Sequence, residues 1–574
     1  MNRNAVIFVL ASLGILLLWQ RTVDHYAPLP VPAASASVAA NGAGQASATG
    51  SAASSASASA APSAGPANFA AASSKASDSA FSASASVPSL SPSKESIVTV
   101  ETAAFEAELS NQGAKFTSLK LKGVQSMGGP GMGVLDLVPS ADQPRYGALE
   151  LEGTDLDSMA WTLLTPKPMD EGGKQVVRFS AAIAKTGLEV IKTFSFDPSG
   201  SVISVNVAVH NAGSVLRSFP APLSLVWGPD LGGEGGGMSR GPVRAGVVQL
   251  ADSVERVPSG KNPQTLDYPA PRWLALKNHY FVVGIFPAAG SAWTRAELRA
   301  DQHITVALQA EGLSIAPGQT LVLNADLWAG PQEYDALKAV GGNFQGVLQF
   351  SYASWLEWLN PACVILLKIL KWFHAVTGNW GVAVILLTIL VRGALFYPSM
   401  KSMVSMRRMQ KKQALLKPRM DTLKKTYKDN PKKLNEETMK LYQEFGVNPL
   451  GGCLPMLIQF PVFFALYDTF AAAYELRGAG FMWRWTDLTA PDPTYIFPIA
   501  MGLTMFLQQR MTPAAAAASE DQQQMQKMMQ WMMPIMFTGM ALYLHWPLGL
   551  LLYWTASNAM GVLQQVVVNK VLVD

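Results

Sequence analysis

One apolar stretch, residues 380–398, constrains the fold of this chain more than any other, because a single charge interrupts it. Read as a helix, the stretch is apolar on every side, and at about 1.5 Å per residue it is long enough to span a bilayer. Its charge is Arg392, and a strongly basic segment begins just beyond it, at Lys401. Since Lys and Arg accumulate on the cytoplasmic side of membranes, the helix should run from outside to inside.

Arg392 needs a compensating environment. A guanidinium stays protonated in a protein, and placing one near the bilayer centre costs at least roughly 2.5–3.5 kcal/mol. The other candidate spans offer no carboxylate at matching depth, since Asp468 should lie near the outer face. Two interpretations remain open. Either Arg392 faces a water-filled cavity that opens to the cytoplasm, or its side chain extends to the lipid phosphates.

The composition indicates an integral membrane protein with a soluble part, since 49% of the residues are hydrophobic and 15% are charged. Residues 401–445 carry 13 Lys/Arg and 5 Asp/Glu in a chain whose net charge is +4. This basic block could meet anionic lipid, RNA or acidic protein surfaces. Cys363 and Cys453 both lie in apolar segments, so we expect buried thiols, with neither a disulfide framework nor a metal site.

The N-terminal part predicts an exported region. Residues 1–24 contain a short apolar run that fits either a cleaved signal peptide or a retained signal anchor, and the residues alone slightly favour cleavage. Residues 25–95 are rich in Ala, Ser and Pro. Such a segment lacks the apolar bulk needed to offset ordering entropy, so it should be a flexible tether.

Residues 96–340 alternate apolar and polar positions, as in 176–180, 189–196 and 202–210, which predicts an all-β sandwich. The sequence Asp-Pro-Ser-Gly at 197–200 predicts a turn between two of these strands. The glycine-rich 231–237 lacks the strand–helix context of a nucleotide loop and should be a surface loop. His279 and His303 leave a sugar-processing site as an alternative.

The remaining segments complete the predicted topology. Residues 341–377 are amphipathic and rich in aromatic residues, and we expect them to lie in the outer membrane interface. Residues 401–446 should form a cytoplasmic helical hairpin, which breaks at Asn430-Pro431. Within 378–574 the expected spans are residues 379–399, 453–474, 494–511, 530–546 and 549–568. With the first span retained, both termini are expected in the cytoplasm.

Three separated motifs resemble the signature of the YidC membrane protein insertase family. They are Asn-Pro-Leu-Gly-Gly-Cys-Leu-Pro-Met-Leu-Ile-Gln-Phe-Pro at 448–461, Val-Arg-Gly at 391–393 with Tyr397-Pro398, and Gly-Leu-Leu-Leu-Tyr-Trp-Thr-Ala-Ser-Asn at 549–558. The resemblance implies a polytopic α-helical membrane protein of the Gram-negative inner membrane, with a five-helix insertase core, a retained N-terminal anchor and a large periplasmic all-β supersandwich domain.

The resemblance also implies a mechanism and its residues. A hydrophilic groove, open to the cytoplasm and the lipid, would admit a substrate's hydrophilic tail while its apolar segment enters the bilayer, without nucleotide, metal or other cofactor. The implied groove residues are Arg392, Thr388, Gln459 and Trp554, where close relatives often have Tyr at the last position. The candidate contacts for substrate helices are Cys453, Met456, Phe460, Met532, Met533 and Met536, although ordinary packing explains the Met residues equally well.

The implied partners are newly made membrane proteins, the Sec translocon and anionic lipids, and no DNA. If ribosomes or signal-recognition components dock, the basic hairpin should serve through Lys424, Lys425, Lys432 and Lys433. The alternative is that the hairpin is an ordinary solvated helix pair.

The sequence leaves three other functions to compare with insertion. A small-molecule transporter would be expected to show internal repeats, and the C-terminal spans show none. An intramembrane protease would need a Ser–His pair or paired Asp residues within the spans, which are not present. A chaperone or assembly platform that binds membrane helices without moving them is compatible with insertion.

Overall fold

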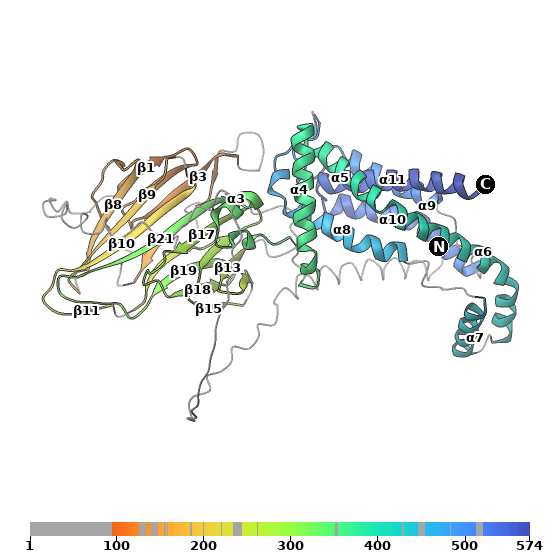
Figure 1. Ribbon diagram of the computed structural model, residues 1–574, viewed down its shortest axis with the longest axis horizontal. Helices are drawn as coiled ribbons and strands as arrows, with labels where there is room; N and C mark the ends of the chain where they lie inside the picture. Colours follow the sequence, from red (N-terminus) through yellow and green to blue (C-terminus); the bar gives the residue numbers. More distant parts are fainter. Residues whose placement is uncertain are drawn as a thin grey trace, which may run out of the picture.

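The computed structural model describes most of the chain beyond the tether. The described residues are 95–125, 134–138, 147–153, 156–157, 159–183, 186–198, 200–219, 221–232, 244–260, 262–350, 354–427, 430–445, 454–482, 484–511 and 520–573. The expected anchor at 1–24, and the tether except for Glu95, lie outside them. Figure 1 shows a β sandwich at one end of the molecule and a helical bundle at the other.

Two large antiparallel sheets and one small sheet form the β domain. The nine-stranded sheet runs in the order β1 (Ile97–Glu101), β2 (Phe105–Ser110), β3 (Lys115–Gln125), β5 (Gly147–Glu152), β12 (Leu223–Gly228), β19 (Ile304–Ala310), β18 (Arg295–Ala300) and β15 (Gln264–Pro269), with β4 (Val134–Asp136) beside β3. The ten-stranded sheet runs β14 (Val254–Pro258), β13 (Ala245–Gln249), β16 (Trp273–Lys277), β17 (Phe281–Pro287), β21 (Thr320–Pro331), β10 (Val202–Asn211), β9 (Leu188–Phe196), β8 (Lys174–Ile183) and β6 (Thr162–Leu163), with β7 (Met169–Glu171) beside β8. The short pair is β11 (Arg217–Ser218) and β20 (Ser314–Ile315).

The alternation in the sequence sets which face of each strand is buried. The predicted turn at 197–200 joins β9 to β10, which pair with Phe196 opposite Ile203. Phe194 is fully buried and makes an edge-to-face contact with Phe116 of the other sheet, at 5.3 Å between ring centroids. Side chains from both sheets thus interdigitate in one apolar core, and the β-sandwich prediction is confirmed.

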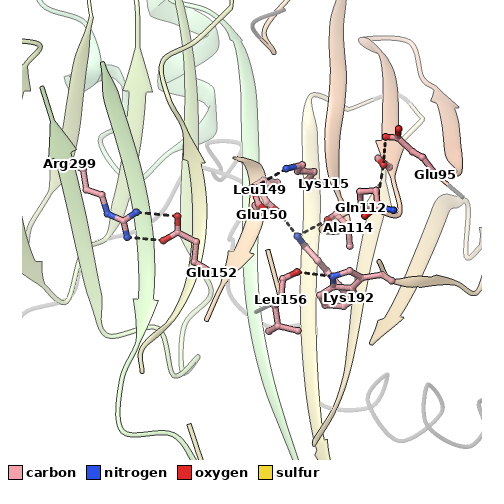
Figure 2. Close-up of polar contacts among 12 residues, drawn as sticks. Glu95, Gln112, Ala114, Lys115, Leu149, Glu150, Glu152, Leu156, Lys192 and Arg299 are labelled. Atoms are coloured by element: carbon pink, nitrogen blue, oxygen red, sulfur yellow. Dashed lines mark hydrogen bonds and ion pairs between the residues drawn. The ribbon is translucent and has the colours of Figure 1, made fainter. Parts of the chain in front are cut away.

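A lysine occupies one inward position of this core. Lys192 of β9 is fully buried, and its ammonium donates to the carbonyl oxygens of Ala114, at 2.8 Å, and Leu149 (Figure 2). Both acceptors belong to the opposite sheet or its turns, so this side chain links the two sheets. Burial lowers the pKa of Lys192 to about 7, although the nearby Glu150 carboxylate opposes the shift.

The helical part follows the sandwich in the chain. Its elements are α3 (Tyr334–Val340), η1 (Phe344–Val347), η2 (Ser354–Leu359), α4 (Asn360–Thr377), α5 (Trp380–Ala394), α6 (Phe396–Thr426), α7 (Pro431–Glu444), α8 (Leu454–Ala472), η4 (Tyr474–Leu476), α9 (Ile496–Met511), α10 (Glu520–Tyr543) and α11 (Leu548–Val573).

The helix boundaries differ from expectation at two places. The helix expected over residues 379–399 ends as α5 at Ala394, with Leu395 as its C-cap. The first helix of the basic hairpin begins directly afterwards, at Phe396, as α6. Pro398 is therefore in the first turn of α6, where its missing N–H would have no intrahelical partner in any case. The other difference is in α10, which begins at Glu520, ten residues before the expected span.

The helix α4 has an unusual direction. Figure 1 shows it between the sandwich and the bundle, crossing the direction in which α5, α8, α10 and α11 run. Among the described residues, Leu356–Thr377 is the one helix that is long and apolar enough to cross a membrane, while Trp380–Ala394 and Phe460–Ala472 are shorter apolar helices. Hydropathy alone thus gives weak evidence for several spans.

The buried lysine predicts how the stability of the β domain depends on pH. Because the folded pKa of Lys192 is lowered to about 7 from 10.5, the unfolded state binds more protons between these values. The free energy of unfolding should therefore rise with pH from about 7 to about 10, by on the order of 1 kcal/mol per pH unit. Thermal unfolding of the full-length protein in detergent, followed by the β signal in circular dichroism, measures this. In Lys192→Met the slope should fall by about half, because Lys277 of the same domain is also buried, with its pKa lowered to about 7, and contributes a similar slope. An unchanged slope would refute the assignment.

Candidate functional site

Local contacts fix the start of α5 and so the position of Arg392. Asn379 caps the helix, since its side-chain oxygen accepts from the Val382 N–H at 3.0 Å. The Asn379 amide also donates to the Phe481 carbonyl at 2.7 Å. Gly381 lies against the Phe481 ring, where a Cβ atom would collide with it. These contacts anchor one end of α5, and its buried side packs on α4 and α11.

Arg392 is half-buried and bonds sideways to the last helix. Its Nε and one terminal nitrogen donate to the Ser557 hydroxyl, at 2.8 and 2.5 Å. Counted from the ends nearer the sandwich, Arg392 is about 18 Å along α5 and Ser557 about 14 Å along α11. The two residues therefore lie at similar depth, and in this structure Arg392 reaches across to α11.

The bond leaves the positive charge of Arg392 unneutralised. Among the described residues, no carboxylate lies within ion-pair distance of its guanidinium. A guanidinium has five N–H donors, and one hydroxyl satisfies only part of them. The remaining donors need water or another polar group, because unsatisfied donors in hydrocarbon are costly.

The other predicted groove residues are placed differently. Thr388 is fully buried, and its hydroxyl donates to the Val384 carbonyl of its own helix at 2.7 Å. It is thus one turn before Arg392 but bonded within α5. The side chains of Gln459 and Met456, and Cys453 as a whole, lie outside the described residues.

Trp554 of α11 is the centre of an aromatic cluster. Its ring stacks on Trp546 at 5.3 Å and touches Phe463 of α8 at 5.1 Å and Phe537 of α10 at 5.4 Å between centroids. Among the described residues, α8 and α10 make few or no direct backbone contacts, since α8 packs mainly on α4 and α10 on α9. The Trp554 ring therefore fills the space between them, nearer the sandwich than Ser557.

The candidate helix-contact residues are on these same two helices. Phe460 of α8 is 45% exposed, and Trp531 of α10, directly before the Met pair, is 59% exposed. Met532, Met533 and Met536 are partly buried. Both helices contain an internal proline, Pro461 in α8 and Pro534 in α10.

Sequence reasoning missed the polar partners that α11 supplies. Besides Ser557, Asn558 faces α9, where its amide lies 3.4 Å from the Met501 carbonyl and 3.4 Å from the Thr504 hydroxyl. Both residues belong to the motif at 549–558. Two successive polar residues inside an apolar run were a usable signal, because each must find a partner within the bundle.

The basic hairpin forms a small satellite domain. Leu416 and Met420 of α6 and Leu441 of α7 make its buried cluster. Lys425, Lys432 and Lys433 are exposed, and the side chain of Lys424 lies outside the described residues. In the described ranges, no group of three His, Cys, Asp or Glu residues could hold a metal ion.

A helical bundle that holds a cation among apolar helices, joined through a transverse helix to a large β sandwich, defines a class: a polytopic membrane protein with an extramembrane domain. Two family models match the chain, the 60Kd inner membrane protein over residues 372–574 and the YidC periplasmic domain over residues 97–362.

Three bacterial relatives, each named membrane protein insertase YidC, match most of the chain. The relative from Geobacter sulfurreducens is 34% identical over 82% of this chain and 85% of its own. The relative from Syntrophus aciditrophicus is 31% identical over 99% of this chain and 100% of its own length. The relative from Cupriavidus necator is 30% identical over 99% of this chain and 98% of its own length. This chain therefore belongs to the YidC family of membrane protein insertases.

Solved structures give weaker likenesses. A galactose mutarotase-like protein from Lactobacillus casei is 11% identical, covers 41% of this chain and 100% of its own, and has a TM-score of 0.30. A likeness this low carries no argument for the sugar-processing alternative.

The Arg392–Ser557 bond can be tested by stability. Ser557→Ala removes the acceptor and should lower the free energy of unfolding by about 1–3 kcal/mol, because charged donors lose a partner inside the bundle. Thermal unfolding in detergent measures the loss, with Ala559→Ser, on the exposed side of the same helix, as the control. A loss no larger than that of the control would show that the bond contributes little.

Proposed function

We propose that this chain, as a membrane protein insertase, uses the Arg392–Ser557 site to admit hydrophilic tails of substrates into the bundle. The observation that carries the proposal is a guanidinium bonded to a neutral hydroxyl, with no described carboxylate beside it. Such a site keeps a net positive charge and unused donors inside an apolar bundle. It attracts acidic side chains and can bind the backbone carbonyls of an extended tail.

The apolar segment of the substrate leaves between α8 and α10. These helices have few or no direct backbone contacts among the described residues, and their exposed aromatic side chains, Phe460 and Trp531, face outward. The Trp554 cluster supports this route because it blocks the space nearer the sandwich. The substrate thus enters from the cytoplasmic side and exits to lipid.

No chemical step is needed for this movement. Burial of the substrate's own apolar residues supplies the free energy, at about 25 cal/mol per Å² of apolar surface. The polar site lowers the cost of bringing peptide groups partly into the membrane. The protein therefore acts as a catalyst of partitioning without covalent chemistry, nucleotide or metal.

The arrangement in the membrane follows from the family. The chain is an inner-membrane protein with a periplasmic β domain. We place both termini in the cytoplasm and α4 in the outer interface. The exposed face of α4 carries Ile365, Trp372 and Val376, and Trp358 of the preceding η2 is exposed as well. These apolar side chains suit the boundary between headgroups and acyl chains.

The partners are newly made membrane proteins, with or without the Sec translocon. The basic hairpin binds ribosomes, signal-recognition components and anionic lipids. The hairpin's exposed lysines suit RNA phosphates or anionic lipid headgroups. Membership in an insertase family favours this function over a small-molecule transporter.

The charge of Arg392 is tested by reconstitution in liposomes with a single-span substrate, with protease protection of its translocated tail as the readout. Arg392→Ala should slow insertion of a substrate with an acidic tail roughly tenfold, if about 1.4 kcal/mol of attraction is lost. Arg392→Lys should retain most activity, and a substrate with a neutral tail should be affected much less. Equal slowing of both substrates would contradict an electrostatic role.

The docking role of the hairpin is tested by charge reversal. Replacing Lys424, Lys425, Lys432 and Lys433 by Glu should weaken binding of ribosomes carrying a nascent membrane protein, and the wild-type affinity should fall steeply with salt. Lys440→Glu is the control, because Lys440 already pairs with Glu437 at 2.7 Å. Co-translational insertion that survives the fourfold reversal would count against this role.

A further inference from the structure

One ammonium group on α4 joins three parts of the molecule. Lys371 Nζ lies 2.8 Å from the Glu333 carboxylate and 2.5 Å from that of Asp335, both next to the last strand of the sandwich. It also lies 3.5 Å from the carboxylate of Glu475, which follows α8 in the bundle. A transverse helix thus holds a charge between the β domain and the end of α8.

Glu475 is the buried member of this group. Its side chain is 7% exposed, whereas those of Glu333 and Asp335 are 36% and 56% exposed. Burial raises the pKa of Glu475, and Lys371 opposes that shift. Loss of Lys371 would leave the Glu475 carboxylate buried beside Glu333 and Asp335, which is unfavourable because an uncompensated buried charge is costly.

The same transverse helix supports α8 at a second point. The Thr469 hydroxyl and the Cys363 carbonyl are 3.5 Å apart, and the Cys363 thiol lies 3.5 Å from the Ala465 carbonyl. Among the described residues, α8 has few backbone contacts with α10 or α11. Its main backbone packing is therefore on α4, while Phe463 and Phe470 contact rings of α11.

The sandwich holds the residues that follow α8 as well. The Tyr474 ring meets Phe281 edge-to-face at 5.8 Å, and the Arg477 guanidinium lies over Phe281 at 5.2 Å from the ring centroid. Phe281 begins β17 and belongs to the core of the sandwich. The segment 474–477 is thus held from two sides, by α4 and by the β domain.

We propose that Lys371 is a positioning residue for insertion: it fixes the end of α8 through Glu475 and ties that end to the sandwich through Glu333 and Asp335. This inference rests on the proposed function, in which substrate helices leave along α8 and α10. An anchored end keeps α8 in place while its other side is open toward the substrate. Lys371 itself touches no substrate.

The experiment uses photo-crosslinking from both sides of the route. A photoreactive phenylalanine analogue replaces either Phe460 on α8 or Trp531 on α10 in the full-length protein, and crosslinks to a single-span substrate are measured during insertion into liposomes. Each probe is combined with Lys371→Met, Lys371→Arg, or Lys371→Met with Glu475→Gln. The matched control is Lys368→Met, since Lys368 is on the same helix and lies over the Tyr334 ring, at 5.6 Å, without an ion pair among the described residues.

The expected result is selective. In Lys371→Met the crosslink from position 460 should fall roughly fivefold, because the end of α8 loses the ion pairs that hold it and the buried Glu475 carboxylate is left unpaired. The crosslink from position 531 and both crosslinks in Lys368→Met should stay within about twofold, as for surface changes away from such features. Lys371→Arg should recover most of the signal, because arginine keeps the positive charge that pairs with the three carboxylates. The double variant should stay low, because it lacks the ion pairs that hold the end of α8.

Three results would overturn the inference. Lys371→Met could behave like Lys368→Met, both crosslinks could fall together as in general unfolding, or the double variant could restore the wild-type signal. Failure of the proposed function would look different, since wild-type protein would then insert substrate without a crosslink from either position.

Discussion

The bond between Arg392 and the Ser557 hydroxyl is the interaction on which this account depends. A carboxylate in the place of Ser557 would neutralise the guanidinium and make a closed, structural ion pair. A hydroxyl holds the side chain at a fixed depth but leaves its charge in place. The two residues of the pair belong to α5 and α11. Trp554 of α11 fills the space between α8 and α10 on the side nearer the sandwich.

Cations with buried or half-buried side chains recur in the molecule, and each has different partners. Lys192 joins the two sheets through carbonyl oxygens, in a site with no opening to solvent. Lys371 joins the sandwich to the bundle through carboxylates. Arg392 has neither several carbonyl acceptors nor a carboxylate among the described residues, which distinguishes it from the two structural lysines.

The sequence predicted the elements better than their contacts. Period-two alternation found the β sandwich, and Asp197 to Gly200 located one of its hairpins, because both signals are local. The same alternation places Lys192 on the same strand face as Val190 and Phe194. Its burial could therefore have been predicted, but it was missed. Arg392 was found because a charge in an apolar run is conspicuous. Its partner Ser557 could not be assigned, since 165 residues separate the two and only helix packing joins them.

The break at Leu395 and the early start of α10 were also missed, because a proline in a first turn and a polar helix extension leave no mark in hydropathy. The role of α4 could not be predicted from the sequence either, because it depends on the orientation of the helix and on its contacts in three dimensions. By length and composition it is the one helix among the described residues that could cross a membrane, yet it crosses the direction of the bundle (Figure 1). Its lysines signal the interface, but their partners are distant in sequence.

The central claim is that water reaches the Arg392–Ser557 site from the cytoplasm, and thiol labelling tests it most directly. Ser557→Cys is placed in a background without Cys363 and Cys453 and treated in sealed vesicles with a small, charged thiol reagent from either side. Ala559→Cys, on the exposed side of the same helix, reports labelling at a lipid-facing position of similar depth. The account predicts labelling at 557 from the cytoplasmic side alone and little at 559. Protection of 557 from both sides, or labelling from the periplasmic side, would contradict it.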